Sequence, residues 1–490
     1  MKRLILLVIV SLVLFLFIYP AAFLHSSDSL PDDNDTRLIA YLIGQSQQNL
    51  LQNNPLFYGT FFAPDHNTLA YSDLFFTSAL LTLPFRLFTN SPVVIFNLAL
   101  IVGFSLTFFT AFFLFDYLFK NPWLTTICTL LFCLSGFHFT YLPHLQMFSL
   151  WPLCLATYLF LRFQNENRPH YLTLVFSLVT FQILESLFLV YLIFFTLFIL
   201  FLAKPQQFKT ILLRLLPFVP IWFYLTFPYL HLHYSYPEAS RSIRDAAHFS
   251  LGLEEVFTKY HGFTVLVLFF ALLPLTQKIT KLKPWWKIFW FSLVLSLGPV
   301  VKLLGQTVKI LGLPIPLPYT LFYYLFPGFT GFRTPSRFIV LTLLSTTIII
   351  GYSLLPFMSK LKTPTKMIFL FLILSLLLLE LRPPLSSYYV NATLPSVYQE
   401  VQQLPPNAII IELPVKLWND NNHQIESLRS LYSLKHQHRR FGGFSGFATN
   451  AWIDLVQKIN SQRLTDKNLS QLRLLGITHV VENNRLYPLP

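Results

Sequence analysis

The stretch "MKRLILLVIVSLVLFLFIYPAAFLHS", residues 1–26, decides the fold class of this chain. A cationic start is followed by an apolar run of about 17 residues or more, which as a helix is long enough to cross roughly 30 Å of hydrocarbon. A signal peptide has a similar beginning, but the run is long and "AAF" is a poor cleavage site. We therefore expect an uncleaved first membrane helix.

Apolar runs of this kind recur along most of the chain, which is 54% hydrophobic and only 11% charged. Backbone groups in lipid need internal hydrogen bonds, and alternating ten-residue barrel segments are absent, so helices are expected. The sequence predicts a mostly α, polytopic membrane protein. We place eleven membrane helices near residues 4–23, 92–118, 123–142, 146–162, 171–184, 187–203, 210–229, 263–277, 285–303, 338–357 and 367–381.

The formal net charge of +14 is distributed in a way that indicates topology. About fifteen Lys and Arg residues lie in the turns after every second predicted helix, where only Asp116 and Glu166 oppose them. Such turns are cytoplasmic, which places the N-terminus in the cytoplasm and the C-terminus outside the plasma membrane. Nucleic acid is not expected as a partner, because no soluble segment gathers cations with interleaved aromatic residues.

The chain is predicted to have two domains. Residues 1–383 form the membrane domain, with a large first outside loop at 24–91 that carries an amphipathic "LFFTSALLTLPFRLF" on the membrane surface. Residues 384–490 have the composition of a small extracytoplasmic α/β domain. In this domain "NAIIIELPV" is typical of a buried strand, "NAWIDLVQKINSQRL" of a helix, and "QLRLLGITHVVEN" of a helix, turn and strand.

Three aspartates, Asp32, Asp33 and Asp35, lie within "SLPDDNDTRLIAYLIG" at residues 29–44. One interpretation is structural, because Asp is a favoured N-cap residue and a helix is expected to begin near Thr36. The other is functional: a carboxylate at the mouth of the bundle is suited to act as a general base or a metal ligand. Spacing alone does not separate these interpretations.

Four arginines are expected on the same side of the membrane: Arg333 and Arg337 in "FRTPSRF", and Arg241 and Arg244 in "SRSIRD". The planar guanidinium group suits phosphate oxygens, so a lipid-borne phosphate is a sensible partner. The alternatives are membrane anchoring and salt bridges within the loops.

Two further residues are candidate substrate ligands. Glu185 falls within an apolar stretch, where a tight turn is expected to lift it to the outer surface, and His144 follows Pro143 at another outer helix end. A histidine in such a place is more often structural than functional.

Several segments together resemble the GT-C superfamily of membrane glycosyltransferases, especially bacterial proteins of the mannosyltransferase-like and arabinosyltransferase-like kind. They are "DDNDTRLIAYL" followed by "FFAPDHNTLAYSD", then "SGFHFTYLPHLQMFSLWPLCL", "GFRTPSRFIVLTLL" and the tail segments "AIIIELPV", "GGFSGF" and "LLGITHVV". In that superfamily an acidic residue of the first outside loop is the proposed base. Aligning the Gly-Asp of that superfamily with "DD" puts the base on Asp33, with Asp35 as the second candidate. The sequence departs from the pattern at Asp32, Arg37 and Ile39.

The resemblance implies an inverting hexosyl or pentosyl transfer on the outer face, from a polyprenyl-phosphate-linked sugar to a glycan, lipid or protein acceptor. The cofactor that it allows is a divalent metal, Mg or Mn, held by Asp33 and Asp35. Two alternatives remain open: a non-catalytic envelope or lipid-handling protein on the same scaffold, and a secondary transporter. Transporters usually carry polar groups near the bilayer midplane, whereas here such groups concentrate at the outer helix ends.

Overall fold

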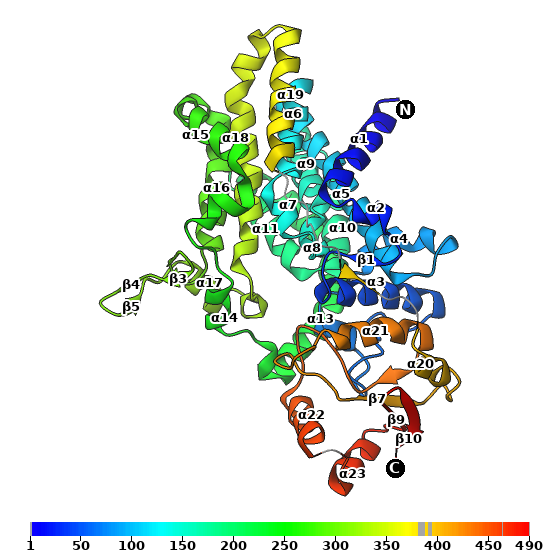
Figure 1. The fold of residues 1–490 in the computed structure, drawn as a ribbon. Coiled ribbons are helices and arrows are strands. Elements are labelled where there is room, and N and C mark those ends of the chain that lie inside the picture. The colour runs from blue at the N-terminus through cyan, green and yellow to red at the C-terminus, as the bar shows by residue number, and fades with distance from the viewer. Residues whose placement is uncertain (1, 381–387, 391–393, 463, 490) are drawn as a thin grey trace.

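The computed structural model describes residues 2–380, 388–390, 394–462 and 464–489. A long bundle of helices forms the upper part of the molecule in Figure 1, and a smaller domain with a four-stranded sheet lies below it. Helix α1 (Lys2–Ile18) starts at the upper end of the bundle, while strand β10 (Arg485–Pro488) lies in the lower domain. The two ends of the described chain therefore lie on opposite sides of the bundle.

Each of the eleven segments predicted to cross the membrane contains helix. Besides α1 they are α5 (Pro92–Phe119), α6 (Pro122–Cys133), α9 (Trp151–Glu166), α10 (His170–Glu185), α11 (Leu187–Phe201), α12 (Phe208–Leu215) with α13 (Val219–Ser235), α15 (Phe263–Leu272), α16 (Lys283–Ser296), α18 (Ile339–Lys360) and α19 (Thr363–Glu380).

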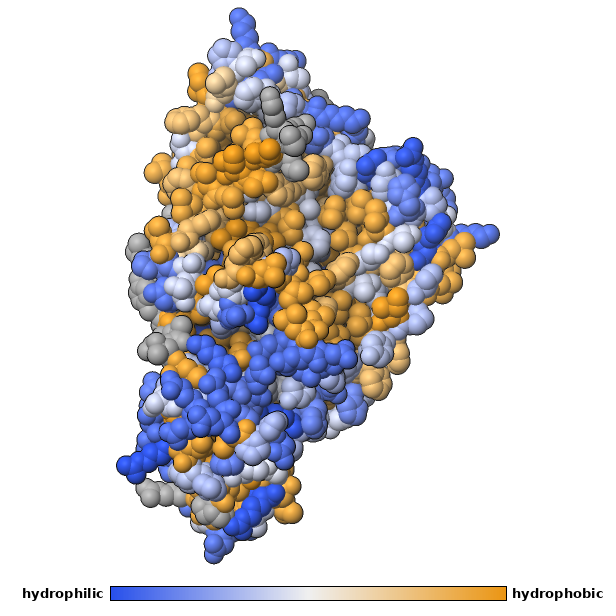
Figure 2. All heavy atoms as spheres, turned by 90° about the vertical axis from the view of Figure 1, so that its right-hand side faces the viewer, coloured by the Kyte–Doolittle hydropathy of each residue, from blue (hydrophilic) through white to orange (hydrophobic). Residues whose placement is uncertain are grey.

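Length and composition allow part of these helices to be assigned as membrane spans. Among the described residues, five helical stretches are long and apolar enough to cross a membrane: Pro92–Phe119, Pro122–Thr140, Pro205–Ser235, Pro335–Lys360 and Thr363–Glu380. Four more are apolar but shorter: Ile5–Ile18, His170–Glu185, Leu187–Phe201 and Phe263–Thr276. Hydrophobic residues cover much of the upper part of the face in Figure 2. The chain is a multi-pass membrane protein, and eleven crossings stays a prediction.

Several helix boundaries differ from those predicted, and two of the breaks have a clear backbone signature. The segment 123–142 is interrupted at Ser135, whose backbone is extended (φ −71°, ψ 159°), and a short helix α7 (Gly136–Thr140) follows. The segment 285–303 ends at Ser296, because Gly298 has a φ of +70° and Pro299 cannot continue a helix. The hydropathy stays high across both sites, so the sequence pattern did not predict the breaks.

The first loop, 24–91, is largely ordered into short elements. Strand β1 pairs antiparallel with β6, which ties the start of the loop to the chain that follows α19. The elements here are α2 (Ala21–Leu24), β1 (Ser29–Leu30), α3 (Asp35–Gln52), η1 (Thr68–Tyr71), α4 (Phe76–Thr82), η2 (Leu83–Leu87) and, from the distant segment, β6 (Tyr388–Tyr389).

Short elements join the remaining helices. Within the bundle these are α8 (Leu145–Phe148), η3 (Pro205–Gln207), η4 (Leu216–Phe218), η7 (Leu273–Lys278) and η8 (Thr280–Leu282). The other two long loops contain η5 (Pro237–Ala239), α14 (Ile243–His248), η6 (Val256–His261), β2 (Lys302–Leu303), β3 (Gln306–Thr307), β4 (Lys309–Ile310), β5 (Leu313–Pro314), α17 (Tyr319–Leu325), η9 (Phe329–Gly331) and η10 (Pro335–Phe338).

The C-terminal domain is the small α/β domain that the sequence predicts. Its sheet has the strand order β10-β9-β7-β8, with β7 parallel to both β8 and β9, and β10 antiparallel to β9. The predicted boundary between 383 and 384 lies outside the described residues. The elements are α20 (Ser396–Val401), β7 (Ile409–Leu413), α21 (Ile425–His436), β8 (Arg439–Arg440), α22 (Asn450–Gln462), α23 (Asp466–Leu474), β9 (His479–Glu482) and β10.

The first loop of the membrane domain covers the edge of this sheet at β8. The amide of Arg440 donates to the carbonyl of Thr60 (2.7 Å), and the amide of Ala63 donates back to the carbonyl of Arg440 (2.9 Å). Residues 60–63 thus satisfy backbone groups that an uncovered edge strand would leave unpaired. This pairing holds the C-terminal domain against the loop that carries the aspartates.

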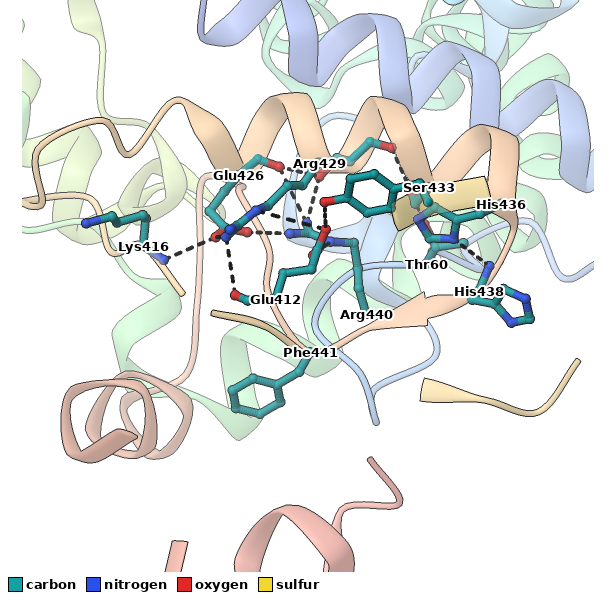
Figure 3. Close-up of polar contacts among 12 residues, drawn as sticks. Thr60, Glu412, Lys416, Glu426, Arg429, Ser433, His436, His438, Arg440 and Phe441 are labelled. Carbon is teal, nitrogen blue, oxygen red and sulfur yellow. Dashed lines mark hydrogen bonds and ion pairs between the residues drawn. The ribbon is translucent and has the colours of Figure 1, made fainter. Parts of the chain in front are cut away.

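A buried ion network supports the junction, as Figure 3 shows. The fully buried guanidinium of Arg440 donates to Glu412 and Glu426, and Arg429 donates to Glu426 (2.6 Å). Burial alone would raise the pKa of Glu412, but Arg440 and Arg429 outweigh burial and hold that pKa below its usual range. Two cations and two carboxylates therefore balance one another in the interior of the domain.

Candidate functional site

The aspartates of the first loop have different local roles. Asp32 Oδ1 accepts hydrogen bonds from the amides of Asn34 and Thr36 (both 2.9 Å) and from the Thr36 hydroxyl (3.0 Å). These bonds satisfy backbone donors at the start of α3, which begins at Asp35. The N-cap residue itself is Asn34, whose side chain makes no capping hydrogen bond, so Asp32 supports the helix start from two residues before the N-cap, with its Oδ1 engaged in holding the loop.

Asp33 and Asp35 face different neighbours. Burial lowers the pKa of the Arg37 guanidinium, and the negative charge of Asp33 raises it, so these two side chains influence each other. Asp35 Oδ2 instead lies 3.7 Å from Nδ1 of His144. The side chain of Asp35 is 43% exposed and that of His144 is 30% exposed, so a small molecule can reach both groups.

Asp35 lies in an environment that changes its acidity. Burial raises the pKa of its carboxyl group, while the charges of Arg337 and Arg333 oppose that rise. The carboxyl is recessed among protein atoms although it remains reachable by solvent. A carboxylate with a raised pKa is a stronger base than an ordinary aspartate, as proton abstraction requires.

Arg333 and Arg337 come from the segment "FRTPSRF", which enters α18 through η10. The guanidinium of Arg337 lies 5.4 Å from the ring centroid of Phe188, and that of Arg333 lies 4.4 Å from the ring centroid of Phe249. Among the described residues, neither arginine has a carboxylate oxygen within 4 Å, and the buried Nε of Arg337 has no hydrogen-bond partner. Aromatic rings thus position two cations that no carboxylate of the described residues pairs with directly.

A second carboxylate, Asp73, lies near Arg337. Gln146 Nε2 donates to Asp73 Oδ2 (3.1 Å), and burial raises the pKa of Asp73 while Arg337 opposes that rise. Sequence reasoning did not single out Asp73 or Gln146. Both lie in segments with a family resemblance, "FFAPDHNTLAYSD" and "HLQMF", which was the available signal.

His144 is uncharged at neutral pH. Burial and the positive charges of Arg337 and Arg333 together lower its pKa to about 4. Its contact with Asp35 is therefore a polar contact and not an ion pair at pH 7. A neutral imidazole beside a carboxylate can orient a hydroxyl group through its ring nitrogens.

Three predicted ligands remain. Arg241 lies near the cluster formed by Asp35, His144, Arg333 and Arg337, whereas Arg244 and Glu185 do not belong to it. Arg241 lies close enough to Arg333 for the two charges to repel, and its guanidinium donates to the carbonyl of Gly446 in the C-terminal domain. Arg244 is exposed, and no interaction joins it to the cluster within the described parts of the chain. Glu185 ends α10 at a tight turn, but its side chain is buried and accepts hydrogen bonds from the amide (2.8 Å) and hydroxyl (2.6 Å) of Ser78. Glu185 thereby anchors α4.

The donor set does not form a metal site by itself. In the described ranges, no three His, Cys, Asp or Glu side chains are grouped as ligands of one ion. Asp35 and His144 would have to share Mg or Mn with oxygens from a substrate, and Asp33 faces Arg37. The metal dependence that the family resemblance allows stays a prediction, and the reaction proposed for this site uses no metal ion.

The fold is similar to that of a known membrane transferase. The single-particle cryo-EM structure of the arabinofuranosyltransferase AftD from Mycobacteria matches with a TM-score of 0.60 and 15% sequence identity. The match covers 99% of this chain and 35% of that chain, so this chain spans about a third of its length. Neither protein-family models nor curated proteins match the sequence. The likeness confirms the fold that the sequence predicts, a helical bundle with a small sheet domain.

Proposed function

We propose that this protein is a GT-C glycosyltransferase that moves a sugar from a polyprenyl-phosphate-linked donor to an acceptor outside the plasma membrane. The observation that carries the proposal is the reachable carboxylate of Asp35 beside two unpaired arginines, at the end of the bundle that faces the C-terminal domain. A lipid-borne donor suits this place, because nucleotide sugars stay in the cytoplasm. The N-terminus is cytoplasmic and the C-terminal domain extracytoplasmic in this proposal.

The proposed reaction is a single displacement with inversion. Asp35 takes the proton from an acceptor hydroxyl as that oxygen bonds to the anomeric carbon, and the bond from that carbon to the phosphate oxygen breaks. The electron pair leaves with the polyprenyl phosphate, whose developing charge Arg337 and Arg333 stabilise by charge-assisted hydrogen bonds. Because the leaving group departs as an anion, the site needs no strong general acid.

The acceptor is a glycan, a lipid or a protein whose hydroxyl reaches Asp35. The solvent-reachable position of Asp35 and His144 favours an acceptor outside the hydrocarbon over a solute moving through the bundle. This position of the charged groups favours transfer over secondary transport. The carboxylate of Asp35 also favours transfer over a purely lipid-handling role, because lipid handling would need the arginines but not the carboxylate.

The test is sugar transfer by the purified protein in liposomes, with polyprenyl-phosphate sugars and nucleotide sugars offered separately. We expect transfer from a polyprenyl-phosphate donor only, and a loss of roughly tenfold or more in kcat/KM for Arg337→Gln. The matched control is Arg485→Gln, which removes an exposed arginine of β10. Transfer from nucleotide sugars alone, or no transfer from any lipid donor, would overturn the proposal.

A further inference from the structure

A cavity lies far from Asp35, between the first loop and the C-terminal domain. Its volume is about 380 Å³. Asp35 starts α3 and Gln48 lies near its other end, so the two are about 20 Å apart along the helix axis. The cavity is lined by two cationic side chains and four amides, namely Arg86, Lys435, Gln48, Asn90, Gln402 and Gln437.

The charged residues that line this cavity are cationic. Arg86 and Lys435 line it, and no acidic side chain of the described residues does. The Nε of Arg86 is buried and has no hydrogen-bond partner within the described chain. Two cations and four amides around one cavity are suited to an anionic ligand that accepts hydrogen bonds from them.

The walls of the cavity are held in place by contacts between the two domains. Gln48 Nε2 donates to the carbonyl of Leu434 (2.7 Å), and Gln402 Nε2 donates to the carbonyl of Lys435 (3.2 Å). Pro92, the first residue of the long helix α5, also lines the cavity and brings the positive end of that helix dipole to it. A ligand would therefore enter a site that is already formed.

An exposed apolar edge lies next to Arg86 in the chain. The adjacent side chains of Leu87 and Phe88 are 84% and 86% exposed, and Leu80 and Leu81 of α4 are exposed as well. This exposed apolar edge belongs to the segment predicted to lie on the membrane surface. Figure 2 shows the side of the molecule on which α4 lies, with hydrophobic residues above and hydrophilic residues gathered below them over the C-terminal domain. If that segment lies on the membrane surface as predicted, the cavity opens at the level of the lipid headgroups.

We propose that this cavity binds the phosphate of a membrane-lipid headgroup, with Arg86 and Lys435 as the cations and the surrounding amides as hydrogen-bond donors. The acyl chains would lie along the exposed apolar residues of α4 and η2. One bound lipid would then touch the first loop, α5 and the C-terminal domain together, and fix the domain at the membrane surface. The proposal does not depend on the proposed transfer reaction.

The test is native mass spectrometry of the full chain in detergent, titrated with phosphatidylglycerol. We expect the wild-type protein to keep one tightly bound copy, and the double variant Arg86→Gln/Lys435→Gln to bind that copy roughly tenfold more weakly. Arg485→Gln should bind as the wild type does. Arg86→Lys keeps the positive charge but lacks the planar guanidinium group, so we expect its lipid affinity to lie between those of the wild type and the double variant. Such an intermediate affinity would show that the loss arises at the binding site and not from misfolding.

Two results would overturn the proposal. Equal binding by the wild type and the double variant would mean that Arg86 only anchors the segment in the interface. The second result comes from inorganic phosphate added alone: displacement of the bound lipid at equal concentration would assign the cavity to free phosphate instead of a headgroup. Failure of phosphate to displace the lipid would support the lipid assignment.

Discussion

At the scale of single residues, the aspartates of the first loop differ in what surrounds them. Asp32 uses its carboxylate to hold the start of α3, Asp33 acts on Arg37, and Asp35 faces His144 and the charges of Arg333 and Arg337. Alignment with the superfamily motif favoured Asp33, while the geometry favours Asp35 as the proposed base. Sequence spacing could not decide this, because one residue along the start of a helix turns a side chain by about 100°.

The acidity of Asp35 leads to a pH prediction for the proposed transfer. The base works when ionised, so the raised pKa places the acid limb of kcat/KM above the ordinary aspartate value of about 3.9. Arg333→Gln removes a cation that favours the ionised form, and the limb should move to higher pH. The measurement is a pH profile of wild type, Arg333→Gln and Arg485→Gln; an acid limb that moves to lower pH in Arg333→Gln would contradict the assignment.

At the scale of elements, the C-terminal domain depends on the buried pairing of β7, β8 and α21. Arg440 in β8 bridges Glu412 in β7 and Glu426 in α21, and Tyr398 also donates to Glu412. The stretch containing Arg440 is basic, and basic stretches are normally solvated. Its burial could not be predicted from the sequence, because the two carboxylates that pair with it are contributed by distant elements.

Removing Arg440 should destabilise this domain strongly. Arg440→Met would leave two buried carboxylates with Arg429 as their one remaining cation among the described residues, which is expected to lower the free energy of unfolding by roughly 3–5 kcal/mol. Proteolysis of the domain at increasing denaturant concentration measures this change, with Arg485→Met as the surface control. A loss as small as that of the control would contradict the role assigned to the network.

The same network predicts how stability changes with pH. The pKa of Glu412 is lower in the folded domain than in an unfolded chain, where it is about 4.3. Its contribution is therefore present above that value and is lost as the pH falls towards the folded pKa. The denaturation midpoint of the wild-type domain should fall below pH 4, whereas that of Arg440→Met should change less over the same range.

At the scale of the whole molecule, much of the architecture follows from composition. Long apolar runs located the helices of the bundle, and the alternation of strand and helix patterns identified the C-terminal domain. The helix break at Ser135 and the pairing of Thr60 with Arg440 were not predictable. Both depend on contacts between segments that lie far apart in the chain, which hydropathy and local propensity do not record.

The proposed topology predicts which sites are labelled in intact cells. Ser27→Cys in the first loop should react with a membrane-impermeant maleimide, and Lys362→Cys between α18 and α19 should react only after permeabilisation. The native Cys128, Cys133 and Cys154 are buried and should give a low background. Labelling of Lys362→Cys alone in intact cells would reverse the orientation and move the proposed site to the cytoplasm.

The most direct measurement of the proposed mechanism compares Asp35→Asn with Asp33→Asn in single-turnover transfer from a polyprenyl-phosphate sugar. Asp35→Asn should lower the rate by roughly 10²–10⁴-fold, as removal of a general base does, while Asp33→Asn should keep most of the wild-type rate. A large loss in Asp33→Asn together with near-normal transfer by Asp35→Asn would contradict the assignment and return the base to Asp33.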